Sequence, residues 1–171
     1  MIGLFVVSSK VGRQEEIGKK VKERVHYLTK NIRNLMHFGL LIDLTSAEKI
    51  SKEVKDKISG CVIVVATGGT ERIIRVISSN IKKPTLLWAN PFNNSLPSSL
   101  EAFSKLKDKI PIKLFYSPIN KETINEINSF LNTCEVVEKL EKCRLGCVGE
   151  PTKWLLTTKN KKAIEKLGPK V

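Results

Sequence analysis

Two polar segments of the sequence have residue types that suit binding of a small ligand. Thr67-Gly68-Gly69-Thr70-Glu71 separates an apolar run from an amphipathic stretch, and its two glycines would let the backbone approach a ligand closely. Thr70 is a natural N-cap, and a helix start offers free N–H groups and a positive dipole end. Alternatively, Gly68 and Gly69 only turn the chain tightly. The segment is not a Walker loop, because the required lysine spacing is absent.

The second segment, Asn90-Pro91-Phe92-Asn93-Asn94-Ser95, follows another apolar run. Its amides and hydroxyl could donate to and accept from sugar hydroxyls, although asparagine also serves turns and helix caps. The polar and glycine positions of the two segments are therefore our candidate ligand-binding residues: Thr67, Gly68, Gly69, Thr70, Glu71, Asn90, Asn93, Asn94 and Ser95.

The remaining residues that could do chemistry are scattered. His26 and His37 have no neighbouring carboxylate, and we expect His26 at the edge of a packed helix face and His37 at that helix's end. The cysteines lack Cys-x2-Cys spacing, so we expect structural thiols at Cys61, Cys134, Cys143 and Cys147. Asp43, Glu71 and Glu150 could bond hydroxyls but form no evident metal set. We therefore predict no catalytic residue, metal or cofactor in this chain.

An alternation of apolar runs and amphipathic stretches must position these residues. Strands are predicted at Gly3–Ser8, Leu40–Leu44, Cys61–Ala66, Thr85–Ala89 and Ile112–Tyr116. Helices are predicted over Gln14–Met36, Ala47–Ile58 and Thr70–Ile81, from near Pro97, and from Asn120 through about Lys142. Gly39 should end the first helix, and Thr45 and Glu48 should cap the second. In the helix near Pro97, Leu100, Phe103 and Leu106 should point inward.

This order predicts an α/β fold, a doubly wound parallel sheet of the flavodoxin-like (Rossmann-like) three-layer type with strand order 2-1-3-4-5. Ligands of such sheets bind beyond the carboxyl ends of the strands, where both polar segments would lie. The loops Ser8-Ser9-Lys10, Asp43–Ser46 and Tyr116-Ser117-Pro118 would share that edge.

The C-terminal part predicts a sixth strand over Arg144–Val148 and a partly helical Trp154–Leu167. We therefore divide the chain into a flavodoxin-like domain, 1–143, and an extension, 144–171, which either packs on that domain or begins a second one in longer relatives. The start of another unit at the end of the chain predicts a fragment, or a truncated relative, of a longer protein.

The chain has a formal net charge of +13 and a pI of about 9.7, which favours polyanions. However, the lysines are spread over nearly every helix, and aromatic residues make up 6% of the chain, too few to predict a base-stacking surface. A solvated basic surface and a nucleic-acid footprint both remain open. No apolar run approaches a membrane span or a signal peptide, so we expect a cytoplasmic protein that does not bind membranes.

Three segments resemble one family in sequence order. Val65–Glu71 resembles the loop after strand three of L-fucose isomerase-like proteins, in the L-fucose/L-arabinose isomerase superfamily. Asn90–Ala102 is similar to the family's segment around Asn-Asn-Ser-Leu-Pro, and Arg144–Leu155 resembles its strand followed by Gly-x-Pro-Ser-x-Trp-Leu.

The resemblance implies the N-terminal domain of an aldose–ketose isomerase that acts through an ene-diol. Manganese would be held by later domains, so this chain would be non-catalytic, would form homo-oligomer contacts and would border a sugar pocket. The alternative hypothesis is a binding module for an anionic partner, RNA or a phosphorylated metabolite, at the helix N-terminus after Gly68-Gly69.

Overall fold

The computed structural model describes residues 1–10, 14–144, 165 and 168–169. The chain divides into two units, Met1–Leu131 and Asn132–Val171, and the site described below lies within the first. The strands are β1 (Ile2–Val7), β2 (Leu35–Leu41), β3 (Gly60–Val65), β4 (Thr85–Ala89) and β5 (Ile112–Tyr116). The helices are α1 (Gln14–Asn31), α2 (Leu44–Val54), α3 (Glu71–Ile81), α4 (Ser95–Leu106) and α5 (Lys121–Lys142).

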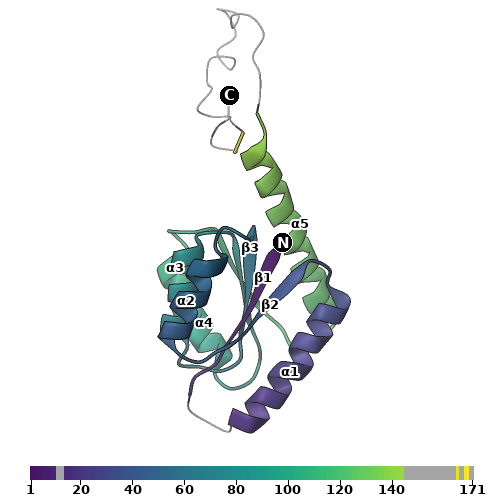
Figure 1. The fold of residues 1–171 in the computed structure, drawn as a ribbon. Helices are drawn as coiled ribbons and strands as arrows, with labels where there is room; N and C mark the ends of the chain where they lie inside the picture. The colour runs from purple at the N-terminus through teal and green to yellow at the C-terminus, as the bar shows by residue number, and fades with distance from the viewer. Residues whose placement is uncertain (11–13, 145–164, 166–167, 170–171) are drawn as a thin grey trace, which may run out of the picture. The chain divides into compact units, whose positions relative to one another are not determined.

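The five strands form one parallel sheet in the order β2-β1-β3-β4-β5, which confirms the predicted doubly wound fold (Figure 1). Every residue of β1, β3 and β4 is buried, as expected for strands covered on both faces. Val7 pairs with Val65, and Val65 pairs with Ala89. The loops after β1, β3 and β4 therefore start side by side at the carboxyl edge of the sheet.

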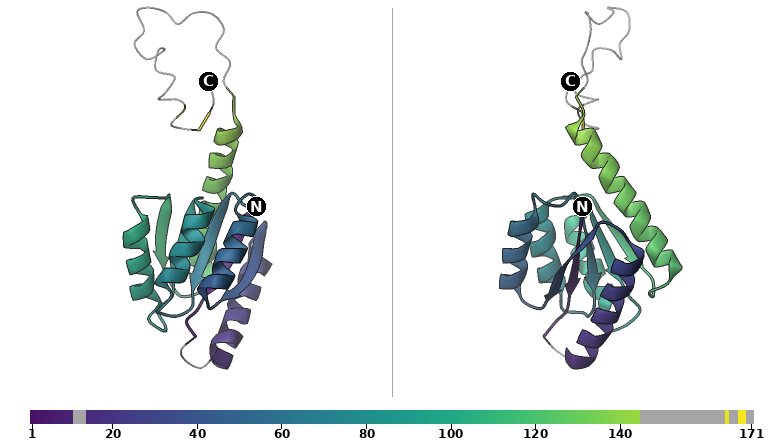
Figure 2. Two further views of the ribbon diagram at one scale, coloured as in Figure 1. Left: turned by 60° about the vertical axis from the view of Figure 1, so that its left-hand side comes forward. Right: turned by 45° about the vertical axis from the view of Figure 1, so that its right-hand side comes forward.

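Helices cover the two faces of the sheet separately. Helices α2, α3 and α4 pack on one face, and α1 lies on the other with the first turns of α5 (Figure 2). Because side chains alternate along a strand, Phe5 and Val7 enter the α2–α3–α4 core together with Ile63 and Val65. The helices that follow β1 and β3, α1 and α3, therefore lie on opposite faces of the sheet. The two connecting loops diverge at the carboxyl edge and leave space between them.

The boundary between α1 and β2 differs from the prediction. The predicted helix ran to Met36, but α1 ends at Asn31 and Leu35 already begins β2. Asn34 has a φ of 62° and reverses the chain, a conformation that asparagine tolerates well. Gly39, predicted as the helix stop, lies inside β2 with a φ of 88°, where the register against β1 shifts. His37 is therefore a strand residue.

Two other helices begin earlier than predicted. The N-cap of α2 is Asp43, which accepts hydrogen bonds from Ser46 N at 2.8 Å and Ser46 Oγ at 3.0 Å, so the predicted Thr45–Glu48 capping box is wrong. Helix α4 starts at Ser95, two residues before Pro97. Of the residues predicted to point inward, Leu106 is buried and Phe103 packs against the core. Leu100, predicted to point inward, is 49% exposed, and small residues occupy much of the inner face: Ser95, Ser98, Ser99 and Ala102.

The end of the sheet follows the prediction. Asn120 precedes α5, and its Oδ1 accepts from Thr123 N at 2.9 Å, which confirms the expected cap. The predicted sixth strand, beyond Arg144, and nearly all of the predicted Trp154–Leu167 helix lie outside the described residues, so the division at 143/144 stays a prediction. Within the described ranges, no helix is both long and apolar enough to cross a membrane.

Candidate functional site

A pocket of about 680 Å³ opens at the carboxyl edge of the sheet, between α1 on one side and the loops after β3 and β4 on the other. We call it the rim pocket. Its volume falls in the range of small-molecule sites, roughly 300–1,000 Å³. The described residues that line it are Ser9, Glu16, Ile17, Lys20, Thr67, Gly68, Gly69, Glu71, Asn93, Asn94, Pro97, Ser98 and Glu101.

The rim pocket lies where the chain leaves β1 toward one face and β3 toward the other, the switch point at which such sheets bind ligands. Thr67 ties the two diverging loops together. Its Oγ1 accepts a hydrogen bond from Ser9 N at 2.8 Å and lies 3.3 Å from Ser8 Oγ. Thr67 is 5% exposed, so this hydroxyl fixes the wall of the pocket more than it offers itself to a ligand.

Gly68 places the loops after β3 and β4 in direct contact. Its N–H donates to the carbonyl oxygen of Asn93 at 2.7 Å. A Cβ on Gly68 would lie 3.0 Å from both Cβ and the carbonyl oxygen of Asn94. Asn93 and Asn94 both have left-handed φ values, 56° and 54°, and both side chains are exposed. A side chain at position 68 would therefore force the loop after β4 to shift.

Asn90 and Ser95, two of the predicted ligand residues, do not line the rim pocket. Asn90 Nδ2 and Ser95 Oγ both donate to the carbonyl oxygen of Val65, at 2.7 Å and 2.6 Å. Ser95 Oγ also accepts from Asn90 N at 3.1 Å. Both side chains are almost fully buried and join the ends of β3 and β4. They support the pocket from beneath.

Thr70 is the third predicted residue absent from the lining. It occupies the N-cap position of α3, but its side chain makes no capping hydrogen bond. Its backbone N donates to Ser98 Oγ at 3.1 Å, and its Oγ1 donates to the carbonyl oxygen of Thr67 at 3.2 Å. Thr70 therefore connects the start of α3 to α4. The other predicted residues line the pocket together: Thr67, Gly68, Gly69, Glu71, Asn93 and Asn94.

The described lining of the rim pocket is acidic, although the chain is strongly basic. It holds three carboxylates, Glu16, Glu71 and Glu101, and one ammonium group, Lys20. Lys20 Nζ lies 2.7 Å from Glu16 Oε1, one helical turn away on α1. Both side chains of that pair are about half exposed, so the pair contributes little to stability. Glu71 and Glu101 give the opposite wall its negative charge.

The residues that α1 contributes to the pocket were not among the predicted ligand residues. Glu16, Ile17 and Lys20 lie in the first turns of α1, and sequence alone does not show how closely a helix approaches the sheet edge. A usable signal existed, since the helix that follows the first strand flanks the switch point in a 2-1-3-4-5 sheet. Ser9 was placed on the correct edge but not among the ligand residues.

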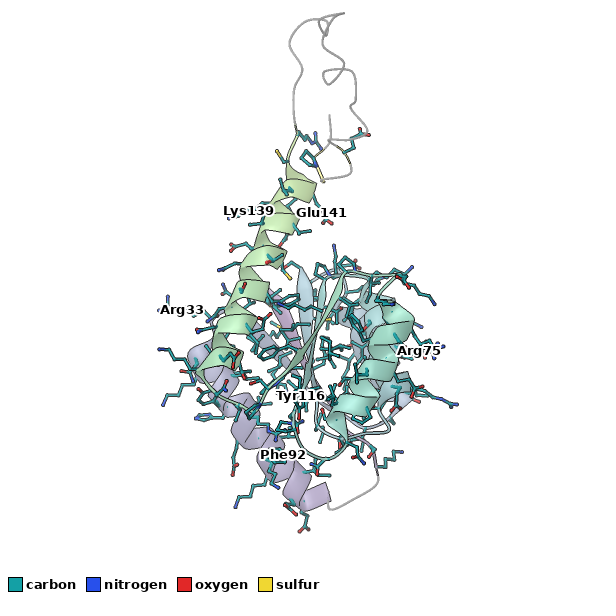
Figure 3. The ribbon with its side chains drawn as sticks, turned by 180° about the vertical axis from the view of Figure 1, so that it is seen from behind. Arg33, Arg75, Phe92, Tyr116, Lys139 and Glu141 are labelled. Atoms are coloured by element: carbon teal, nitrogen blue, oxygen red, sulfur yellow. The ribbon has the colours of Figure 1, made fainter. Side chains whose placement is uncertain are left out.

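A second pocket, of about 420 Å³, adjoins the first and shares Lys20 and Asn93 with it. We call it the aromatic pocket, because its other lining residues are Glu23, Arg24, Tyr27, Phe92 and Ile119. The Phe92 side chain is 57% exposed, and Figure 3 shows it at the carboxyl edge of the sheet, as it does Tyr116 at the end of β5. Burial lowers the pKa of the half-buried Arg24 guanidinium.

The opposite, amino edge of the sheet carries a row of cations in the loops that enter β2, β3, β4 and β5. We call this set the basic edge: Arg33, Lys55, Lys57, Lys82, Lys83, Lys107 and Lys109. In the same loops, Asp56 and Asp108 are the acidic residues. Seven of the 30 lysines and arginines of the chain therefore lie at the edge away from the two pockets.

The histidines and cysteines lie elsewhere. His26 is exposed on α1 and does not line the packed face. The pKa of His37 in β2 is lowered by burial, and a hydrogen bond to the backbone of Gly39 offsets only part of this effect. Cys61 is buried, and its Sγ lies beside Thr85 Oγ1. Burial raises the pKa of the Cys134 thiol to about 12. Cys147 lies outside the described residues. Among the described residues, no group of three or more His, Cys, Asp or Glu side chains could hold a metal ion.

Comparison with known proteins gives no family for this fold and site: no protein-family model matches the chain, and no curated protein is significantly similar to it.

Proposed function

We propose that this domain binds the hydroxyl groups of a small polyol, such as a sugar, in the rim pocket. The observation that carries the proposal is the lining itself. Carboxylates from α3 and α4, Glu71 and Glu101, face a pocket edged by the amides of Asn93 and Asn94. Carboxylates accept hydrogen bonds from hydroxyl groups, and amides both donate and accept, which is the pattern that a ligand with many hydroxyls satisfies.

The charge of the pocket argues against an anion at the helix N-terminus after Gly68-Gly69. Glu71 is the first residue of α3, where its carboxylate already interacts favourably with the helix dipole. Glu101 lines the same pocket, so a phosphate at this position would face two carboxylates. A neutral polyol meets no such repulsion.

The resemblance of the loops after β3 and β4 to L-fucose isomerase-like proteins supports a sugar as the polyol. On the same basis, we propose that the domain is a non-catalytic part of a sugar isomerase-like assembly. It would then contribute homo-oligomer contacts and one wall of a sugar site, while the metal-dependent chemistry would belong to other domains.

Isothermal titration with a panel of aldoses, ketoses and alditols tests the proposal. We expect a dissociation constant in the millimolar range or tighter for at least one neutral polyol. Glu101→Gln should weaken it roughly two- to tenfold, because one charge-assisted acceptor is lost. Glu53→Gln, which changes an exposed carboxylate on α2, is the matched control and should leave the affinity unchanged. No heat with any neutral polyol at millimolar concentration would reject the proposal.

A polyanion is a second candidate partner, and the basic edge favours it. Its cations come from four successive loops on one edge of the sheet, and Lys55, Lys57, Lys82, Lys107 and Lys109 are exposed. Binding there would use phosphate contacts and would show little base preference. Gel shifts with duplex RNA at low salt, repeated with Lys55→Gln/Lys57→Gln/Lys82→Gln, should show binding that the triple variant weakens. The matched control is a triple variant on α1, Lys19→Gln/Lys22→Gln/Lys30→Gln, which removes the same amount of charge. Equal loss of RNA binding in the two triple variants would contradict the assignment of binding to the basic edge.

A further inference from the structure

Arg24 is a partly buried charged group near the carboxyl edge. It lies on α1, is half-buried, and lines the aromatic pocket beside Tyr27, Phe92 and Ile119. Its guanidinium makes no hydrogen bond or ion pair with any residue that the structure describes. A partly desolvated charge without a partner is unfavourable, and a bound anion would remove that penalty.

The surroundings of Arg24 would strengthen an interaction with an anion. Tyr27, Phe92 and Ile119 are exposed, but their apolar surface excludes part of the solvent around the half-buried guanidinium, which favours a charge-assisted hydrogen bond there. A guanidinium presents a planar fork of donors that matches carboxylate and phosphate oxygens. Glu23 lines the same pocket, but it is exposed and, being one position from Arg24, projects in a different direction around the helix.

The aromatic pocket is continuous with the rim pocket. Lys20 and Asn93 belong to the lining of both. Arg24 follows Lys20 by one turn of α1, a rise of about 6 Å along the helix axis. One ligand of sugar size could therefore place its hydroxyls against the carboxylates of the rim pocket and extend a terminal group past Lys20 to Arg24.

The two pockets differ in charge, and this difference sets the orientation of such a ligand. The described lining of the rim pocket has three carboxylates and Lys20, whereas that of the aromatic pocket has Lys20 and Arg24 against Glu23. A terminal anionic group would be repelled from the first pocket and attracted to the second.

We propose that the ligand of this domain is a polyol with an acidic terminal group, whose anion is bound by Arg24 in the aromatic pocket. This inference rests on the proposed function, because it assumes that the polyol occupies the rim pocket. A sugar acid and a sugar phosphate share the required chemistry, a planar or tetrahedral oxyanion at the end of a chain of hydroxyls.

Three probes with one carbon skeleton separate the possibilities: sorbitol, gluconate and sorbitol 6-phosphate. Titration calorimetry of the wild-type chain should show that at least one of the two anions binds about tenfold or more tightly than sorbitol. If only gluconate shows the gain, the terminal group is a carboxylate; if only sorbitol 6-phosphate does, it is a phosphate.

Arg24→Met keeps an unbranched apolar stem and removes the charge, and it should reduce the anion's affinity to that of sorbitol. Arg24→Lys, which keeps the charge without the fork, should give an intermediate affinity and provides a second variant if Arg24→Met folds poorly. Arg75→Met is the matched control for net charge and should retain the full preference. Arg75 is exposed on α3, lines neither pocket and lies away from Phe92 in Figure 3.

Two results would overturn the inference in different ways. If sorbitol binds and neither anion binds more tightly, or if Arg75→Met lowers the preference as much as Arg24→Met does, the role of Arg24 is wrong and the polyol pocket stands. If none of the three probes binds at millimolar concentration, and the neutral sugar panel also gives no heat, the proposed function fails together with the inference.

Discussion

A pair of glycine substitutions tests the packing that shapes the rim pocket. In Gly68→Ala, the new Cβ would lie 3.0 Å from two Asn94 atoms, and one of them is a backbone oxygen that cannot rotate away. The loop after β4 would have to move, which weakens the 2.7 Å hydrogen bond from Gly68 N to the Asn93 carbonyl. Gly18→Ala, inside α1, meets no heavy atom within 4 Å.

The magnitudes follow from these two environments. Overpacking of this kind costs about 1–3 kcal/mol, and a net backbone hydrogen bond is worth about 1 kcal/mol, so Gly68→Ala should destabilise the domain by about 1–3 kcal/mol. Gly18→Ala should stabilise it by up to about 1 kcal/mol, because alanine favours a helix interior more than glycine does.

Urea denaturation followed by circular dichroism measures both effects. With a slope of about 1–3 kcal/mol per molar urea, the midpoint should fall by roughly 0.5–2 M in Gly68→Ala and rise slightly in Gly18→Ala. Gly68→Ala should also weaken polyol binding, because Asn93 and Asn94 are displaced. A Gly68→Ala protein with wild-type stability would refute the described loop contact, and a clearly destabilised Gly18→Ala would contradict the open surroundings of Gly18.

Two further predictions concern the caps and loops of the same edge. Two hydrogen bonds from Ser46, first that of its backbone N–H and then that of its hydroxyl, hold the pKa of Asp43 below its ordinary value. The ionised Asp43 carboxylate therefore stabilises the fold above the unfolded pKa of about 3.9, and this stabilisation is lost as pH falls through the lower folded pKa. Urea midpoints should drop as the pH falls below about 4, and Asp43→Asn should flatten part of that drop; an unchanged pH profile would contradict this assignment. Thr67→Val removes the acceptor for Ser9 N and should destabilise the domain by about 1–3 kcal/mol in the same urea assay, whereas Thr29→Val, at an exposed hydroxyl on α1, should change stability by less than about 0.5 kcal/mol. Equal effects of the two threonine changes would show that the Thr67–Ser9 link is unimportant.

Most of the sheet follows from local patterns in the sequence. Cys61–Ala66 and Thr85–Ala89 are continuous apolar runs, and such runs read as strands that are buried on both faces. The alternation with amphipathic helices then sets the parallel order, which the structure confirms. The start of β2 was missed because Ile32 and Leu35 continue the helical spacing of α1. Only the left-handed turn at Asn34 breaks it, and asparagine is too common in helices and loops to mark that turn.

The candidate site was predictable in part. Gly68, Gly69, Asn93 and Asn94 line the rim pocket as expected from their position after apolar strands. Asn90 and Ser95 have the same polar character in the sequence, but they bond the Val65 carbonyl beneath the loops, and their burial depends on a contact between β3 and β4. The contributions of α1, including Arg24, depend on how that helix packs over the edge, and sequence spacing does not encode this.

The most direct test of the central claim is a map of amide chemical shifts during titration with sorbitol. If the rim pocket binds a polyol, the amides of Gly68, Gly69, Asn93, Asn94 and Glu71 should shift together in a saturable way, and those of Lys57, Lys82 and Lys107 at the basic edge should not. Saturable shifts confined to the basic edge, or unchanged rim-pocket amides at millimolar sorbitol, would contradict the account.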